Sequence, residues 1–135
     1  MNVKSLKAPL APGATIGILG GGQLGRMLAL AAARLGLKTH IYSDESESCG
    51  FLVASSSTRG GYHDHDKLEE FAATCDVVTF EFENVPDATA EFLAAHVPVA
   101  PGARALKVAQ DRLFEKDFEF ASFAFHVKTM LIAKS

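Results

Sequence analysis

The sequence has few cysteines, no long apolar run and no excess of positive charge. Its two cysteines, Cys49 and Cys75, do not form a C-x-x-C pair and cannot staple a domain of 135 residues, so we expect free thiols in a reducing compartment. No run reaches the roughly 18 apolar residues of a membrane span. Residues 1–12 lack the apolar centre of a signal peptide. These absences predict a cytoplasmic protein with no membrane partner.

The charge balance argues against a nucleic-acid-binding protein. The formal net charge is −3 and the sequence pI is about 5.9, whereas binding to a phosphate backbone requires a basic face. With 48% hydrophobic and 21% charged residues, the composition is that of a globular domain. The length suffices for one domain with a real core.

A glycine cluster follows the first clear strand pattern. Residues Thr15–Leu19 form a short apolar run, and a helical pattern begins at Gln23. Between and within them, Gly20, Gly22 and Gly25 fit G-x-G-x-x-G. Glycine permits a tight turn and close approach of a ligand, and the free N–H groups at a helix N-terminus suit a phosphate. The pattern alone does not specify the ligand, and a purely structural turn remains an alternative.

The rest of the chain alternates between strand and helix patterns. The first helix, over residues 23–35, has Leu24, Met27, Leu28, Ala31 and Leu35 at helical spacing. We expect further strands at 38–42, 76–81 and 96–99, a short edge strand near 58–62, helices at 63–74 and 86–95, and one or two helices between 102 and about 120. Residues 43–57 are expected to form a loop with one helical turn. This order predicts an α/β fold, a Rossmann-like doubly wound parallel sheet.

Four segments resemble one family of ligases. They read GGGQLGRML at 20–28, CDVVTFEFENVP at 75–86, VAPG at 99–102 and AQDRLFEK at 109–116. Together they are similar to 5-(carboxyamino)imidazole ribonucleotide synthase, an ATP-grasp ligase of purine biosynthesis. The resemblance covers about residues 15–118, the front third of such an enzyme. It implies a pre-ATP-grasp domain at 14–118 and a divergent tail at 119–135, with the ATP-grasp and C-terminal domains absent. Residues 1–13, which include Pro9 and Pro12, are expected to form a loose lead-in to the first strand.

The resemblance also implies a function. Enzymes of this family use ATP and magnesium to activate bicarbonate and carboxylate the exocyclic amine of aminoimidazole ribonucleotide. We therefore expect this chain to be the substrate-binding portion of such a ligase, with the ribonucleotide as its small-molecule partner. We expect the chain alone to bind neither ATP nor magnesium and to be inactive. Because the family commonly forms homodimers, a homodimer is a further expectation.

The residues that match the family motifs imply a binding site. Glu81 and Glu83 are two positions apart at a strand end, so their side chains share a face, and ligands bind at the carboxyl ends of strands in open α/β sheets. The resemblance implies a 5′-phosphate on the glycine loop, ribose or aminoimidazole contacts from the acidic segment, and adenine-nucleotide contact by Arg112. The implied substrate-binding residues are Gly20, Gly21, Gly22, Gln23, Leu24, Glu81, Glu83 and Asn84. No catalytic residue or metal ligand is assigned.

Other interpretations remain open from the residues alone. Asp44 ends the second strand, where a ribose-binding acid of an NAD-dependent oxidoreductase would lie. The chain could also be a catalytically inactive truncated binding module. Residues 63–66, His-Asp-His-Asp, could ligate a metal, but aspartate at a helix start is also explained by capping. Arg26 is either a ligand contact or a solvated helix residue.

Overall fold

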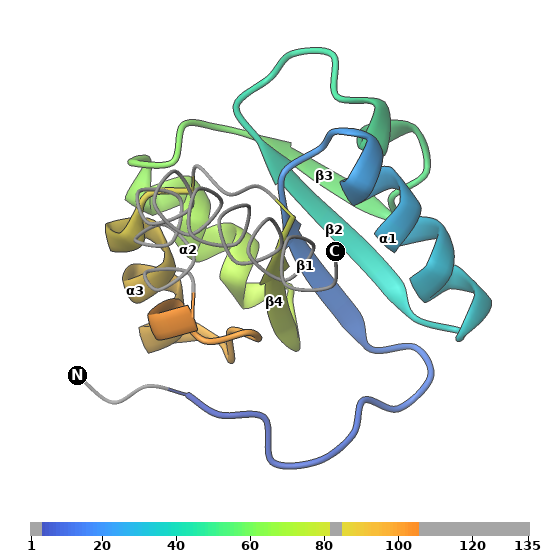
Figure 1. Ribbon diagram of the computed structural model, residues 1–135, viewed down its shortest axis with the longest axis horizontal. Coiled ribbons are helices and arrows are strands. Elements are labelled where there is room, and N and C mark those ends of the chain that lie inside the picture. Colours follow the sequence, from blue (N-terminus) through green and yellow to red (C-terminus); the bar gives the residue numbers. More distant parts are fainter. Residues whose placement is uncertain (1–3, 82–84, 106–135) are drawn as a thin grey trace, which may run out of the picture.

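The computed structural model describes residues 4–81 and 85–105 (Figure 1). Four strands form one parallel sheet, in the order β3-β2-β1-β4. They are β1 (Thr15–Leu19), β2 (Lys38–Ser43), β3 (Ser56–Arg59) and β4 (Val77–Phe80). The α/β class and the parallel sheet are as the sequence predicts. The expected tail at 119–135 lies outside the described residues, and the proposed domain limits remain predictions.

Helices cover both faces of the sheet. The helix α1 (Gln23–Arg34) and the short 3-10 helix η1 (Cys49–Leu52) lie on one side, and α2 (His65–Ala73) and α3 (Asp87–His96) lie on the other (Figure 1). Because side chains alternate along a strand, Ile18 packs with the first group and Leu19 with the second. The sheet is therefore the middle of three layers.

The larger hydrophobic cluster lies under α2 and α3. Phe71 is fully buried there, with its ring centroid 5.3 Å from that of Tyr42 and 4.9 Å from that of His40. The buried members are Leu19, Tyr42, Leu68, Phe71, Ala72, Val78, Val85, Ala90, Leu93 and Val97. The cluster under α1 has three buried members, Ile18, Ala29 and Ile41. Burial of apolar surface is thus concentrated on one face of the sheet.

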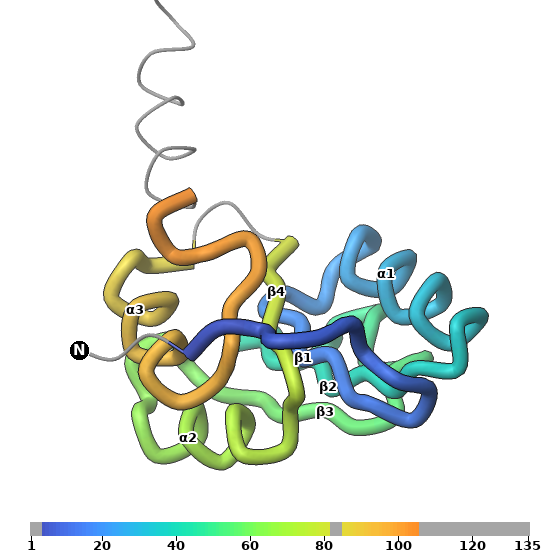
Figure 2. Tube along the Cα trace, turned by 90° about the horizontal axis from the view of Figure 1, so that it is seen from below, coloured from blue at the N-terminus to red at the C-terminus, as the bar shows by residue number. Residues whose placement is uncertain are grey.

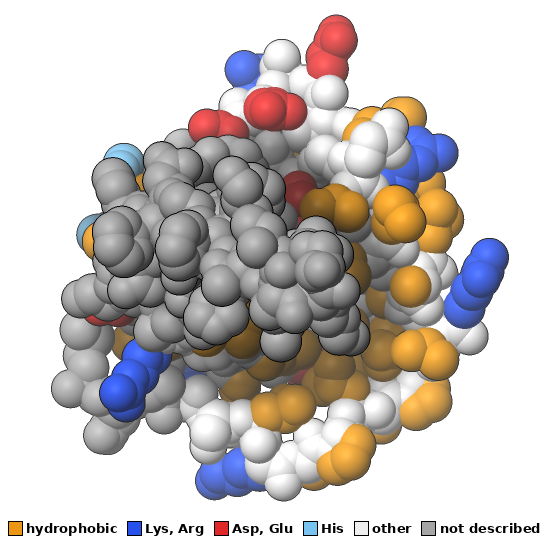
Figure 3. Space-filling view, viewed as in Figure 1, with side chains coloured by type: hydrophobic (Ala, Val, Ile, Leu, Met, Phe, Trp, Pro, Cys, Tyr) orange, Lys and Arg blue, Asp and Glu red, His pale blue; other side chains and the backbone are white. Residues whose placement is uncertain are grey.

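The helix α1 packs on the sheet through its small residues. Its buried positions are Gly25, Ala29 and Ala32. The large apolar side chains of this segment point outward: Leu24, Met27, Leu28, Leu30 and Leu35 are 42–71% exposed. Figure 3 shows hydrophobic side chains gathered over α1 on this face of the molecule. The helical spacing of the apolar residues predicted the helix correctly. These residues, however, lie on the exposed side of α1 and do not face the sheet.

Local signals explain where some of the elements begin or end. Gly36, just after α1, has φ 74°, the left-handed conformation that ends many helices. Asp64 caps α2, because its carboxylate Oδ1 accepts a hydrogen bond from the Lys67 N–H at 3.2 Å. The edge strand β3 ends at Arg59, earlier than expected, since two glycines follow it. The strand expected at 96–99 is reduced to a single parallel bridge between Val78 and Val99.

The chain before β1 is attached to α3, on the side of the sheet that α2 and α3 cover. The Lys4 N–H donates a hydrogen bond to the Ala94 carbonyl in α3 at 2.9 Å, and Figure 2 shows this blue segment running from β1 toward α3. The lead-in expected as loose is therefore tied to the domain at residue 4. Among the described residues, no helix is long and apolar enough to cross a membrane.

Candidate functional site

A polar hollow of about 210 Å³ opens where the strands end. It is bounded by the glycine loop after β1, the end of β2 and the residues after it, the first residue after β4, and the loop before α2. Its lining residues are Gly20, Gly21, Gly22, Ser43, Asp44, Glu45, Tyr62 and Glu81. This is the carboxyl edge of a parallel sheet, the place where open α/β folds bind their ligands.

Two glycines of the G-x-G-x-x-G pattern are required by contacts within the protein. Gly20 has φ 110°, a conformation that L-residues with side chains rarely adopt. Its N–H donates to the Tyr42 carbonyl at 2.9 Å, which ties the loop to the end of β2. A Cβ on Gly25 would collide with the Gly20 carbonyl oxygen, so α1 starts in direct contact with its own entry loop. Part of the glycine pattern therefore serves local packing.

Glu81 already occupies the N-terminus of α1. Its Oε1 accepts a hydrogen bond from the Gly22 N–H at 3.3 Å. A Cβ built on Gly20 would lie 2.5 Å from the same oxygen, so glycine at this position makes room for the carboxylate. A helix N-terminus attracts negative charge, and in the structure a side chain at the end of β4 supplies it. A phosphate entering the loop would share or replace this contact.

The hollow is strongly acidic. Asp44, Glu45 and Glu81 line it, and its described lining residues include no lysine or arginine. Burial raises the pKa of Tyr62 well above its ordinary value, and the charges of Asp44, Glu81 and Glu45 raise it further. Burial likewise raises the pKa of Tyr42 to about 12, and the Tyr42 hydroxyl donates to the Gly61 carbonyl at 2.7 Å. Both phenols remain neutral hydrogen-bonding groups at physiological pH.

The structure brings together part of the predicted site. Gly20, Gly21, Gly22 and Glu81 line the hollow as expected. Gln23 and Leu24 are exposed in the first turn of α1 and do not line it. Three other predicted contacts, Glu83, Asn84 and Arg112, lie outside the described residues.

Sequence reasoning missed three residues of the lining. Ser43 and Glu45 lie at and just after the end of β2, and Tyr62 lies in the loop between β3 and α2. Asp44 was considered only as an NAD contact. The available signal was position, because residues that follow parallel strands meet at one edge of the sheet. It could have identified residues 43–45, but Tyr62 depends on the path of a loop.

A protein-family model agrees with this geometry. Residues 13–110 match the family described as the ribonucleotide synthetase pre-ATP-grasp domain. The match includes all four strands and all the residues that line the hollow.

The chain belongs to this family.

Relatives of the pre-ATP-grasp domain include complete biosynthetic enzymes. The chain is 49% identical over 112 residues to N5-carboxyaminoimidazole ribonucleotide synthase of Brucella melitensis biotype 1, covering 83% of the chain and 31% of that enzyme. It therefore spans less than a third of this curated relative's length. The family resemblance stated from the motifs is confirmed.

Solved structures show the same fold. N5-carboxyaminoimidazole ribonucleotide synthetase from Thermus thermophilus superimposes with a TM-score of 0.70 at 50% identity, over 76% of this chain and 28% of that one. An Aspergillus clavatus N5-carboxyaminoimidazole synthase, in complex with ADP and 5-aminoimidazole ribonucleotide, matches with a TM-score of 0.58 at 27% identity, over 79% of this chain and 30% of that one.

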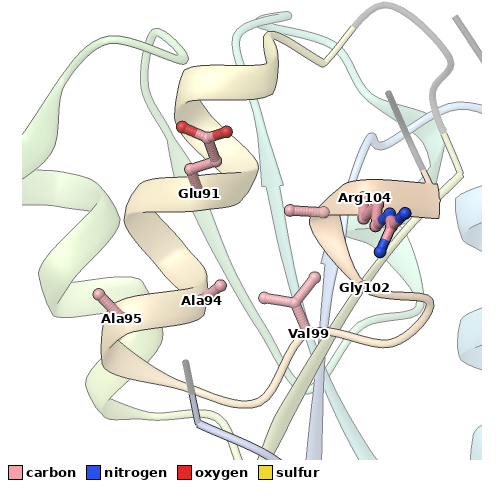
Figure 4. A pocket seen from close by; sticks show the side chains of 7 residues that line it. Glu91, Ala94, Ala95, Val99, Gly102 and Arg104 are labelled. Atoms are coloured by element: carbon pink, nitrogen blue, oxygen red, sulfur yellow. The ribbon is translucent and has the colours of Figure 1, made fainter. Parts of the chain in front are cut away.

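A second hollow of the pre-ATP-grasp domain is apolar. It encloses about 450 Å³ between α3 and the turn that follows it. Figure 4 shows Val99 between α3 and the segment that carries Gly102 and Arg104. Ala94, Ala95 and Ala103 complete its apolar lining, and Glu91 and Arg104 are its charged members. Few polar groups converge here, so its chemistry suits an apolar side chain more than a nucleotide.

Two of the residues at 63–66, Asp64 and His65, have structural roles. The described residues contain no group of three or more His, Cys, Asp or Glu side chains placed to hold a metal ion. Asp64 caps α2, and the His65 ring stacks on Phe92 with 4.3 Å between centroids. Cys75 is half-buried, and burial raises its pKa to about 11, so the neutral thiol packs in the core.

Proposed function

We propose that the chain is the ribonucleotide-binding portion of an ATP-dependent ligase that carboxylates 5-aminoimidazole ribonucleotide. The observation that carries the proposal is the hollow formed by the glycine loop and Glu81 in a pre-ATP-grasp domain. The Aspergillus relative is a complex with that ribonucleotide, which supports the choice of ligand. The carboxylation itself, with ATP and magnesium, is proposed for enzymes of the relatives' full length.

The ligand's functional groups match the two sides of the hollow. The backbone N–H groups of Gly21 and Gly22 are suited to the 5′-phosphate, because oriented amides at a helix start bind anions. Carboxylates accept hydrogen bonds, so Glu81, Asp44 and Glu45 suit the ribose hydroxyls and the amino group. Glu81 would move from the Gly22 N–H to the sugar or base as the phosphate arrives.

The remaining predicted contacts are part of the same proposal. Gln23 and Leu24 are placed next to the glycine loop by sequence, and they would contact the ligand only at the edge of the hollow. Glu83, Asn84 and Arg112 stay predictions from the resemblance, the first two for the substrate and the arginine for the adenine nucleotide. A homodimer is likewise a proposal.

Calorimetry with three ligands in parallel tests the proposed function. Purified chain is titrated with 5-aminoimidazole ribonucleotide, NAD and ATP. We expect the ribonucleotide to bind and Glu81→Gln to weaken it about tenfold, the usual effect of losing one charge-assisted hydrogen bond. Glu69→Gln, the same change at an exposed glutamate of α2 that does not line the hollow, is the matched control and should leave the affinity unchanged.

Each alternative has its own outcome in this titration. Binding of NAD that depends on Asp44 and ignores Glu81 would support an oxidoreductase domain and contradict the proposal. If none of the three ligands binds while circular dichroism shows the fold intact, the result would favour a module without a working site.

A further inference from the structure

We propose that Arg26 is a positioning residue that holds the glycine loop in its binding conformation through residues 48–50. The expected effect of Arg26 on ligand affinity rests on the proposed function, whereas its effect on the loop can be measured without any ligand. The sequence alone left open whether Arg26 contacts a ligand or solvent. The structure indicates neither, because this side chain is half-buried and is not among the residues that line the hollow.

Residues 48–50 hold the Gly21 carbonyl on the side away from the hollow. The Gly50 N–H donates to the Gly21 oxygen at 2.8 Å, and the Cys49 thiol donates to it at 3.7 Å. Ser48 packs directly on the loop, since a Cβ added to Gly21 would lie 2.5 Å from its Cβ and Oγ. A Cβ on Gly50 would in turn crowd the Gly21 oxygen, at 3.0 Å. The two segments are thus in backbone contact.

Arg26 connects α1 to residues 48–50, the segment that contacts the glycine loop. Its Nη1 donates to the Cys49 carbonyl at 3.3 Å, and its own N–H donates to the Gly22 carbonyl at 2.9 Å. One residue therefore contacts both the glycine loop and the segment that presses on it. A second link comes from buried Ser48, whose hydroxyl donates to the Ser43 hydroxyl at 2.9 Å.

Because of the geometry of the peptide unit, the contacts of residues 48–50 with the Gly21 carbonyl also orient the Gly22 N–H in the site. The carbonyl of Gly21 and the N–H of Gly22 belong to one planar trans peptide, so they point in opposite directions. Holding the Gly21 oxygen toward residues 49–50 therefore aims the Gly22 N–H toward Glu81 and the hollow, as observed. If residues 48–50 moved away, this peptide could rotate and the donor would be lost from the site.

Amide exchange and ligand affinity together test the role of Arg26. The variants are Arg26→Ala and Arg26→Lys, and the matched control is Arg34→Ala, which removes an exposed arginine from the last turn of the same helix. By NMR, we expect the Gly50 amide to exchange about tenfold faster in Arg26→Ala, as loss of one charged hydrogen bond implies. Amides of Ile18 and Ile41 should keep their protection.

The affinity for 5-aminoimidazole ribonucleotide should fall about tenfold in Arg26→Ala with an unchanged melting midpoint, a split that a purely structural arginine would not give. The affinity of Arg26→Lys should lie between those of the wild type and Arg26→Ala, since lysine keeps the charge without the planar fork of donors. Unchanged Gly50 exchange in Arg26→Ala, or faster exchange with unchanged affinity, would overturn the inference. If the wild-type chain binds no ribonucleotide, the proposed function fails, and the Gly50 exchange alone still decides whether Arg26 holds the loop.

Discussion

At the scale of single residues, His40 is a buried histidine with a defined hydrogen-bonding arrangement. Its ring nitrogens lie 2.7 Å from Thr74 Oγ1 and 2.8 Å from Thr58 Oγ1. The Thr74 hydroxyl donates its hydrogen to the Phe71 carbonyl at 2.8 Å, so it accepts from the His40 Nδ1–H. In the neutral ring, Nε2 then accepts from the Thr58 hydroxyl. Burial lowers the pKa of His40 below 6.5, which favours this neutral form.

This arrangement predicts a pH-dependent stability. The unfolded chain binds a proton at His40 near pH 6.5, while the folded chain binds it only at lower pH. Stability contributed by neutral His40 is therefore complete above about pH 6.5 and is lost as the pH falls through the folded pKa. We expect His40→Gln to lower the free energy of unfolding by about 1–3 kcal/mol at about pH 7.5, with a smaller difference at about pH 5.

Urea unfolding at several pH values measures this effect. His63→Gln, which changes an exposed histidine, is the control and should follow the wild type. A difference between wild type and His40→Gln that stays constant from about pH 7.5 to about pH 5 would contradict the assigned neutral state.

At the scale of elements, α1 is defined by how closely it approaches its neighbours. Its sheet-facing residues are glycine and alanine, so the helix axis can lie near β1 and β2. Its first turn is packed against the Gly20 carbonyl through Gly25. The apolar side chains that stay outside, including Met27 at 62% exposed, form a surface for which the described residues provide no cover.

Two glycine substitutions separate packing from helix propensity. Alanine favours a helix interior over glycine by about 1 kcal/mol, so Gly25→Ala would stabilise α1 if space allowed. Because its Cβ would meet a backbone oxygen, we expect a net loss of about 2 kcal/mol or more in the free energy of unfolding. Gly22→Ala is the control: its φ is −73° and its Cβ would sit 3.5 Å from Glu81 Oε1, an ordinary contact, so we expect a cost below about 1 kcal/mol. Chemical denaturation compares them, and equal costs would argue against close packing at Gly25.

At the scale of the whole molecule, the two faces of the sheet differ in the apolar surface they bury. The face under α2 and α3 has ten buried members in its cluster, and the face under α1 has three. Hydrophobic stabilisation grows with the apolar area removed from water. The described part of the domain is therefore held mainly from one side.

This asymmetry predicts an order of local opening. Native-state hydrogen exchange at increasing urea should show α1 amides opening at a free energy about 1 kcal/mol or more below that of α2 amides, because fewer buried contacts hold α1. Amides of β1 and β2, which contact both clusters, should be the most protected. A single opening energy shared by α1 and α2 would show instead that the domain opens as one unit.

The sequence by itself determined the order of strands and helices along the chain, the turn at the glycine cluster and the presence of a capping aspartate at the start of α2, because these depend on residues within one or two turns of each other. It also placed Glu81 at a strand end beside the loop. Only the tertiary structure decided that Glu81 binds the Gly22 N–H, that Tyr62 and Glu45 line the hollow, and that α1 turns its small residues inward. Each of these depends on which strands are neighbours and how closely their loops approach, and contacts between residues far apart in the chain leave no periodic pattern in it.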